Sequence, residues 1–371
     1  MIKSIKIRLK PTQEQEQLFW QSCGAKRFAY NWGLARSKEL YEQGIKYNKA
    51  ARRKEFNEYK KQFEWIGNIS AKVTENAFED LDAAMKKFFK KESGFPKFKS
   101  RRTDRPSFYV RYDRMVFENN TVKFEKIGKI KYSSNRKIPQ TPKYILPTCS
   151  FYGKYWYLSF GFECENQTIE HNDLIVGIDL GVKELAVLSN RDEPIRNINK
   201  TKEVSRLKKK LKRKQRQVSR KYELNKQGKK FVKTKNIIRL EQEIKQINRT
   251  LGNIRNNHIH QATASVIKDN PKRVVMEDLN VSGMMKNRHL AKAIQEQKMY
   301  EFIRQMKYKC EWRGIEFVQA DRWFPSSKMC SSCGHIKTDL KLSDRVYRCE
   351  CGLVIDRDKN AAINLSRYEL A

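Results

Sequence analysis

The sequence lacks long apolar runs. No uninterrupted apolar segment among the 371 residues approaches the roughly 18 residues that a membrane-spanning helix needs. The first residues, MIKSIKIRLK, alternate charged with apolar side chains and lack the continuous apolar centre of a secretory signal. We therefore expect a soluble, intracellular protein, and a chain of this length predicts two or three domains.

Acidic side chains are also scarce. The sequence holds 42 Asp and Glu against 79 Lys and Arg, which gives a formal net charge of +37 at pH 7. Such an excess raises the local concentration of a polyanion through counterion release, so nucleic acid is the leading candidate partner. An anionic membrane surface is the alternative, but no basic amphipathic helix stands out for it, and we expect no membrane association.

Cysteine is rare outside one segment. All eight cysteines should be reduced in an intracellular protein, which argues against a disulfide framework. Cys330-x-x-Cys333 and Cys349-x-Cys351 are separated by fifteen residues, and two close thiol pairs at this separation predict a structural zinc ribbon over about 325–353. Four thiolates leave no open position for catalysis. The second pair is one residue shorter than the usual spacing, which puts its geometry in doubt. The isolated cysteines, expected in the core, are Cys23, Cys149, Cys164 and Cys310.

The N-terminal half reads as a strand, a helical region and a β region. Ile5, Ile7 and Leu9 alternate with basic residues, which predicts a half-buried strand over 1–10. Thr12 and Gln15 form a capping-box pattern that opens a helical domain over 11–92. Short alternating segments over 93–168 predict the remainder of a small β-barrel, which the first strand could join.

The C-terminal half, 169–371, predicts an α/β layer. LIVGIDLGVKELAVLS, KRVVMEDLN and IEFVQAD read as strands. Between Lys200 and Lys235 there are seventeen Lys and Arg against two Glu, and the next segment carries apolar residues at 3-4-3-4-3 spacing. We interpret about 198–265 as a basic helical hairpin, in preference to a dimeric coiled coil, because the seam is short. The seam residues are Ile237, Leu240, Ile244, Ile247, Leu251 and Ile254.

Three acidic residues, Asp179, Glu277 and Asp358, stand in apolar contexts. A carboxylate in a core-forming strand is costly to bury unless it is paired or binds a cation. Together the three predict a site for two divalent cations of the kind that hydrolyses phosphodiesters, whereas each one alone could be a cap or a salt-bridge partner. Asp278 competes with Glu277, because strand alternation sends the two to opposite faces and the sequence does not show which one faces the site.

Four motifs in order, GIDLGVKELAVLS, VVMEDLNVSGMMKN, FPSSKMCSSCG and IDRDKNAAINL, closely resemble the TnpB family encoded by bacterial insertion sequences. The N-terminal KIRLKPTQEQEQLFWQSCGAKRFAYNWGL and the central GFPKFKSRR also resemble that family, so the resemblance covers nearly the whole chain. It implies α/β, all-β and all-α parts: an RNase H-like, RuvC-type nuclease core with an inserted zinc ribbon, and an N-terminal β-barrel with an inserted helical domain.

The resemblance also implies a function, that of an RNA-guided DNA endonuclease. The guide would be a structured RNA from the end of the element, with one protein copy per guide, and the target would be double-stranded DNA cut beside a short motif. The family's acidic triad falls on Asp179, Glu277 and Asp358, for two Mg²⁺ or Mn²⁺ ions, and the zinc cysteines match. Such a protein would act in the bacterial cytoplasm, at the nucleoid.

Helical spacing separates Asp358 from its neighbour Asp356. Counting from Asp358, the positions three, four and seven residues later are apolar and could lie close on a sheet, so Asp358 would face the strands. Asp356 lines up instead with Lys359 and Asn360, on what we interpret as the polar side of the helix, and reads as a helix-entry acid.

Two further hypotheses remain at this stage. The chain could be a guide-RNA-dependent DNA-binding repressor that does not cleave, although a pure binder need not keep costly carboxylates in a core. It could also be a zinc-ribbon nucleic-acid protein without a guide, which leaves the acid-bearing strands unexplained.

Overall fold

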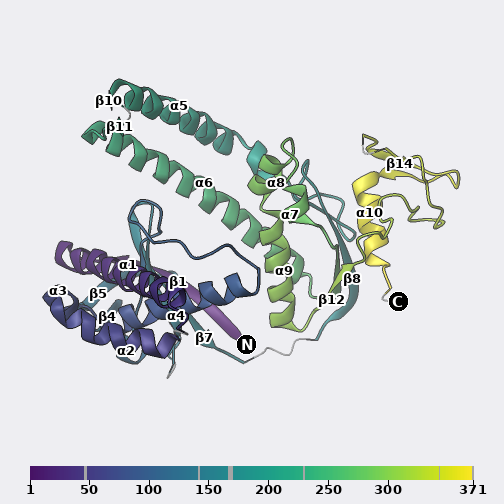
Figure 1. Cartoon of the computed structure of the whole chain (residues 1–371). Helices are drawn as coiled ribbons and strands as arrows, with labels where there is room; N and C mark the ends of the chain where they lie inside the picture. The colour runs from purple at the N-terminus through teal and green to yellow at the C-terminus, as the bar shows by residue number, and fades with distance from the viewer. Residues whose placement is uncertain (46–47, 141–142, 166–169, 229, 342, 370–371) are drawn as a thin grey trace. The chain divides into compact units, whose positions relative to one another are not determined.

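The computed structural model describes residues 1–371 except 46–47, 141–142, 166–169, 229, 342 and 370–371. The chain forms two compact units, Met1–Cys164 and Glu165–Ala371 (Figure 1). The domain boundary expected after residue 168 lies within 166–169, outside the described residues. Within the described part of the chain, no helix combines the length and apolar character needed to cross a membrane.

The first unit contains a seven-stranded antiparallel sheet in the order β2-β6-β7-β1-β5-β4-β3. β1 lies in the middle because Ile5, Ile7 and Leu9 point into the core while the basic residues between them stay exposed. The ring of Phe117 on β3 lies 5.3 Å from that of Phe160 on β7, although three strands lie between β3 and β7 in the sheet, so the sheet is strongly curved. Closure of this sheet into a barrel stays a prediction. Its strands are β1 Ile2–Lys10, β2 Ser107–Tyr109, β3 Val116–Glu118, β4 Thr121–Phe124, β5 Gly128–Ser133, β6 Ile145–Tyr152 and β7 Tyr155–Glu163.

Helices fill the space between β1 and β2 in the sequence. α1 begins with the capping box that the sequence predicts: the Thr12 side chain accepts from the backbone of Gln15, and the Gln15 side chain accepts from the backbone of Thr12. Leu34, Phe56 and Phe78 pack in one core between these helices. The helices are α1 Gln13–Glu42, α2 Lys49–Tyr59, α3 Glu64–Gly67 and α4 Ala71–Phe89, with the 3₁₀ helix η1 Lys60–Gln62; a second 3₁₀ helix, η2 Tyr112–Arg114, follows β2.

The second unit is built on a four-stranded sheet in the order β13-β12-β8-β9. β8, β12 and β13 are parallel, and β9 is antiparallel to β8. Helices α6 and α9 cover one face through Val176, Ile178 and Met276, while α10 packs on the other face through Leu365. The mixed α/β content agrees with the sequence. The elements are β8 Asn172–Leu180, β9 Ala186–Leu188, β12 Pro271–Glu277, β13 Glu316–Ala320, α6 Lys235–Lys268, α9 Met299–Arg313 and α10 Arg357–Ser366.

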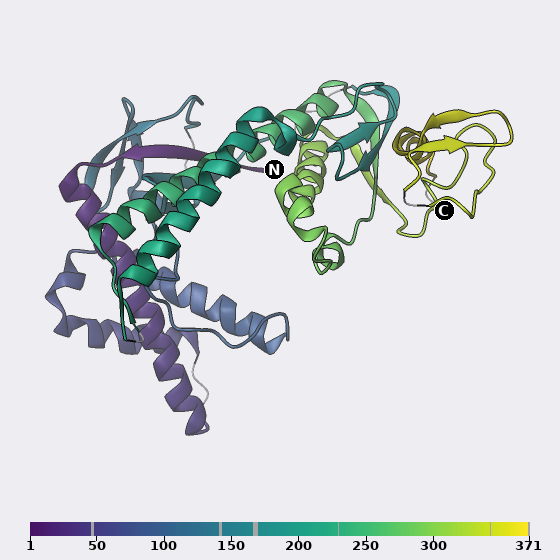
Figure 2. The same ribbon diagram turned by 90° about the horizontal axis from the view of Figure 1, so that it is seen from above.

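α5 and α6 run side by side as a hairpin (Figures 1 and 2). Ile247 and Leu251 of the predicted seam pack against Val204 of α5, so the seam is covered within the chain. The remaining elements of this unit are η3 Ile198–Lys200, α5 Lys202–Leu224, β10 Lys226–Gln227, β11 Lys230–Phe231, α7 Val281–Met284, α8 Ala291–Gln297, and the two strands of the cysteine-bearing segment, β14 Val346–Arg348 and β15 Val354–Asp356.

Gly177 marks the place where α10 crosses β8. A Cβ atom at this position would lie 2.0 Å from the carbonyl oxygen of Ala362 and 2.4 Å from the backbone nitrogen of Ser366. Both atoms belong to the helix backbone, which cannot move aside as a flexible side chain can. The absence of a side chain at Gly177 therefore lets α10 lie directly on the strand.

Substituting Gly177→Ala should push α10 away from β8 and destabilise the second unit by about 1–3 kcal/mol, the usual cost of overpacking. Thermal unfolding of the purified chain measures this effect. Gly24→Ala is the control, since a Cβ at Gly24 meets nothing within 4 Å and the residue lies inside α1. A Gly177→Ala variant as stable as the unmodified chain would contradict the close packing.

Candidate functional site

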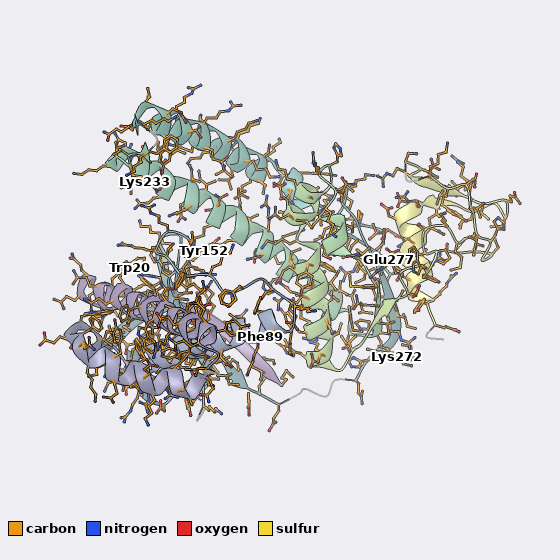
Figure 3. All side chains as sticks on the ribbon, in the orientation of Figure 1. Trp20, Phe89, Tyr152, Lys233, Lys272 and Glu277 are labelled. Carbon is orange, nitrogen blue, oxygen red and sulfur yellow. The ribbon has the colours of Figure 1, made fainter. Side chains whose placement is uncertain are left out.

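Asp179 and Glu277 lie at the carboxyl ends of two neighbouring parallel strands. Ile178 of β8 pairs with Met276 of β12, so the two acidic residues come next in register. Because side chains two positions apart point to the same face of a strand, Asp179 shares a face with Ile175 and Gly177, and Glu277 shares that face with Val275. This is the face of the sheet that α10 covers. Both carboxylates therefore point to the α10 side, and Glu277 lies beside that helix (Figure 3).

Strand alternation also places Glu277 and Asp278 on opposite faces of the sheet, and the two residues have different partners. Asp278 follows the last residue of β12 and its carboxylate is 2.8 Å from the guanidinium of Arg322. Glu277 instead accepts a short hydrogen bond from the hydroxyl of Ser326, on the α10 side. Of this pair, Glu277 is thus the residue whose side chain lies on the same face of the sheet as Asp179.

α10 separates the roles of Asp356 and Asp358. Asp356 is the N-cap: its Oδ1 accepts from the backbone N–H groups of Asp358 and Lys359 at 3.0 and 3.1 Å. Asp358 lies in the first turn, where its oxygens are 3.4 Å from Arg357 and 3.8 Å from Arg345. Asp356 therefore caps the start of the helix, and Asp358 is the residue of the first turn whose negative charge acts on Asp179 more strongly.

Glu277 and Asp358 act electrostatically on Asp179. The pKa of Asp179 is raised from its usual value to about 8, first by burial and then by the negative charges of Glu277 and Asp358. A cation placed among the three would remove both the repulsion and the cost of burial. Carboxylate oxygens are the donors that hard divalent ions prefer, so the donor set fits Mg²⁺ or Mn²⁺.

Four cysteines form a second, separate cluster. The sulfur atoms of Cys330, Cys333, Cys349 and Cys351 all lie within 4.8 Å of one another, and among the described residues no other set of three or more His, Cys, Asp or Glu side chains gathers as closely. Cys330 and Cys351 are 3.6 Å apart, as are Cys333 and Cys349. Tetrahedral zinc with bonds of about 2.3 Å requires sulfur separations near 3.8 Å, so the cluster fits zinc. The shortened Cys349-x-Cys351 spacing therefore still brings both thiols into the cluster.

The cysteine-bearing segment holds α10 through two asparagines. Asn360 donates to the carbonyl of Met329 at 2.7 Å and accepts from the backbone of Ser331 at 2.9 Å. Asn364, one turn later, donates to the carbonyls of Ser326 and Met329 at 2.8 and 2.6 Å. Asn360, which we placed on the polar side of the helix, is not open to solvent there, since both asparagines are buried.

Sequence reasoning missed these contacts, although one signal was available. Asparagines four residues apart within an apolar helix face indicate a buried hydrogen-bonding partner. Lys359 was also missed as a support: its ammonium donates to the carbonyls of Leu188, Ser189 and Arg191, which ties α10 to the end of β9. Together these contacts fix the position of Asp358 relative to the sheet.

The zinc assignment predicts one zinc ion per chain, measurable by elemental analysis. Cys351→Ser should weaken zinc binding by more than about 100-fold, because losing a direct ligand costs more than losing a residue that only hydrogen-bonds to a ligand. The variant should also have a lower melting temperature. Cys164→Ser is the matched control, because Cys164 lies outside the cluster. Full zinc content in the Cys351→Ser variant would refute the assignment.

The pKa of Asp179, about 8, predicts the pH dependence of stability when no metal is bound. The native state keeps this proton between about pH 4 and pH 8 while the unfolded chain releases it, so stability falls as pH rises through this window, by at most roughly 1.4 kcal/mol per pH unit. Denaturant unfolding with a Mg²⁺ chelator measures the slope. Asp179→Asn should flatten it, and the exposed Asp173→Asn should not. Equal slopes in unmodified and Asp179→Asn protein would contradict the burial of this carboxyl.

Comparison with known proteins places the chain in a family. Residues 160–288 match a family described as a probable transposase, residues 1–46 a helix-turn-helix domain, and residues 300–365 a Cas12f1-like TNB domain. The whole chain is 30% identical to a putative RNA-guided DNA endonuclease of Streptomyces pristinaespiralis, covering 90% of it. It is 31% identical to the putative RNA-guided DNA endonuclease InsQ of Escherichia coli K12, covering 92% of it.

A solved structure shares the fold. The Cas12f1 protein of a cryo-EM complex with single-guide RNA and target DNA superposes with a TM-score of 0.61 at 14% identity, over 99% of this chain and 98% of that one. The matched Cas12f1-like TNB domain covers the cysteine-bearing segment and α10, and both full-length relatives are named as putative RNA-guided DNA endonucleases. The chain therefore belongs to the TnpB family.

Proposed function

We propose that this protein is an RNA-guided DNA endonuclease of a transposable element, which cuts target DNA beside a short adjacent motif. The observation that carries the proposal is the group of half-buried carboxylates from β8, β12 and α10, in a chain that resembles RNA-guided DNA endonucleases along its whole length. Asp179, Glu277 and Asp358 would be the catalytic residues.

The architecture of the second unit supports an RNase H-like core of the RuvC type. Its sheet has parallel strands with one antiparallel edge, and helices cover both faces. The acidic residues stand at the carboxyl ends of the parallel strands, the edge where α/β folds place their ligands. We further propose that the curved sheet of the first unit is a β-barrel into which the helical region is inserted.

The three carboxylates would hold two Mg²⁺ or Mn²⁺ ions. Bound there, such ions would polarise the scissile phosphate and supply a nucleophilic water at neutral pH. The protein's own contribution would be to arrange the ligands: Asp179 would release its proton, Glu277 would give up its hydrogen bond from Ser326, and Asp358 would give up its arginine partners to bind the ions. Zinc at the four cysteines would be structural and would order the cysteine-bearing segment, which hydrogen-bonds to α10.

The partner proposed to select the target is a structured guide RNA, one per protein. The exposed face of α5 supports an RNA-binding role, because a row of cations along one helix attracts a phosphate backbone. Since the proposed substrate is double-stranded DNA, we expect the protein to act in the bacterial cytoplasm, at the nucleoid. The exposed basic residues of α5 are Lys202, Arg206, Lys209, Lys210, Lys212, Arg213, Arg216 and Arg220.

Co-expression with the flanking element, sequencing of the RNA that co-purifies, and cleavage of a matched duplex with Mg²⁺ test the proposal. Asp358→Asn should slow cleavage by at least about 100-fold, because several kcal/mol of metal-based stabilisation is lost. Asp356→Asn should cleave as the unmodified protein does, because asparagine is an equally good N-cap.

This pair of variants is matched, since both changes replace Asp by Asn within the start of α10. Equal cleavage by Asp358→Asn and the unmodified protein would overturn the catalytic assignment. Guide-dependent DNA binding without any cleavage by the unmodified protein would favour the repressor alternative, and the absence of a defined RNA would rule out guidance.

A further inference from the structure

An exposed tryptophan, Trp323, lies in the short segment between Ala320 and Ser326, two residues that both contact Glu277. The side chain of Trp323 is 86% exposed, more than any other large hydrophobic side chain that the structure describes. Its neighbour Phe324 turns inward and packs its ring 5.0 Å from that of Tyr368. Of two adjacent aromatic residues, one therefore stabilises the core and the other projects into solvent.

The segment that carries Trp323 is tied to Glu277 at both ends. At one end, Ala320 pairs with Glu277 in the sheet, and its carbonyl accepts from the backbone of Asp278 at 3.2 Å. At the other end, the hydroxyl of Ser326 donates to the Glu277 carboxylate. Trp323 stands three residues from each end, so its Cα lies within about 11 Å of both. That reach corresponds to about three nucleotide rises along a strand.

The same segment is held in place by its own hydrogen bonds. The backbone of Trp323 donates to Oδ1 of Asp321 at 2.8 Å, and the backbone of Asp321 donates to the hydroxyl of Tyr368 at 3.3 Å. Arg322, which stands between Asp321 and Trp323, is held by an ion pair with Asp278 at 2.8 Å. The indole is thus presented from an ordered turn, which keeps the entropic cost of binding to it low.

Trp323 also forms one wall of a hollow of about 560 Å³. Apart from Ala320, the other residues that line it are polar or charged, so the hollow offers one aromatic face among hydrogen-bonding groups. A planar group with a polar edge fits this combination better than a lipid or an aliphatic side chain. The residues around it are Asp278, Gln319, Ala320, Asp321 and Arg322.

We propose that Trp323 is a stacking platform for an unpaired nucleobase of the DNA strand that enters the carboxylate site. The proposal rests on the proposed function. A base exposes its face only when it is unpaired, and stacking on an aromatic ring is tolerant of sequence. Tolerance is what a guided nuclease needs at its cutting site, because the guide reads the sequence elsewhere. Trp323 thereby positions the strand and takes no part in the bond cleavage.

Single-stranded DNA binding to the full chain with its guide RNA tests the proposal. Trp323→Ala should weaken the affinity for a fluorescent oligothymidylate about 5- to 150-fold, measured by anisotropy in the Asp358→Asn background, and Trp323→Phe should restore most of it. Trp65→Ala is the control, since Trp65 is 41% exposed in the first unit. In active protein, Trp323→Ala should raise KM for single-stranded DNA more than it lowers kcat.

The outcomes distinguish failure of the stacking proposal from failure of the proposed function on which it rests. If the unmodified complex cleaves and Trp323→Ala matches it in affinity, KM and kcat, the stacking role is wrong and the proposed function stands. If the unmodified complex never cleaves, the binding measurement still decides the role of Trp323. Loss of guide RNA or of thermal stability equal to the loss of DNA binding would overturn the stacking role in favour of a structural one.

Discussion

The backbone of α10 lies on the backbone of β8 at Gly177, and the second unit's carboxylate group depends on this contact. The position of Asp179 is set by strand β8, whereas Asp358 belongs to helix α10, which is distant from β8 in the sequence. A strand and a helix at an ordinary packing distance would keep these carboxylates farther apart, because a side chain at position 177 would hold the helix away. The absence of one Cβ atom brings the two acids within electrostatic reach of each other.

The cysteine-bearing segment stabilises the same helix from the opposite side. The side-chain amides of Asn360 and Asn364 donate hydrogen bonds to backbone carbonyls of this segment, and Lys359 ties the helix to the end of β9. Zinc would order this short segment, which has little core of its own. The metal proposed for structure and the metals proposed for catalysis would then be coupled through the position of one helix, although their ligands are different residues.

Much of this arrangement could be predicted from the sequence, because it is local or periodic. Alternation along β8 and β12 and the spacing of the cysteines follow from chain geometry alone, and so does the capping role of Asp356. The face on which Glu277 lies could not be predicted, because it depends on which side of the sheet α10 covers.

The burial of Asn360 and the exposure of Trp323 were not predictable for the same reason. Polar and aromatic residues have no fixed environment until their neighbours are placed. Asn360 is buried because the cysteine-bearing segment folds back over α10, and Trp323 is exposed because Phe324 takes the place in the core. Both outcomes are decided by tertiary packing between segments distant in the sequence.

A crystal structure of the full chain with guide RNA, target DNA and Mn²⁺ tests the central assignment most directly. We expect anomalous Mn²⁺ peaks coordinated by Asp179, Glu277 and Asp358, with Asp356 still bonded to the first turn of α10. Mn²⁺ held by Asp356 or Asp278 in place of these residues, or α10 displaced from Gly177 in the loaded complex, would contradict it.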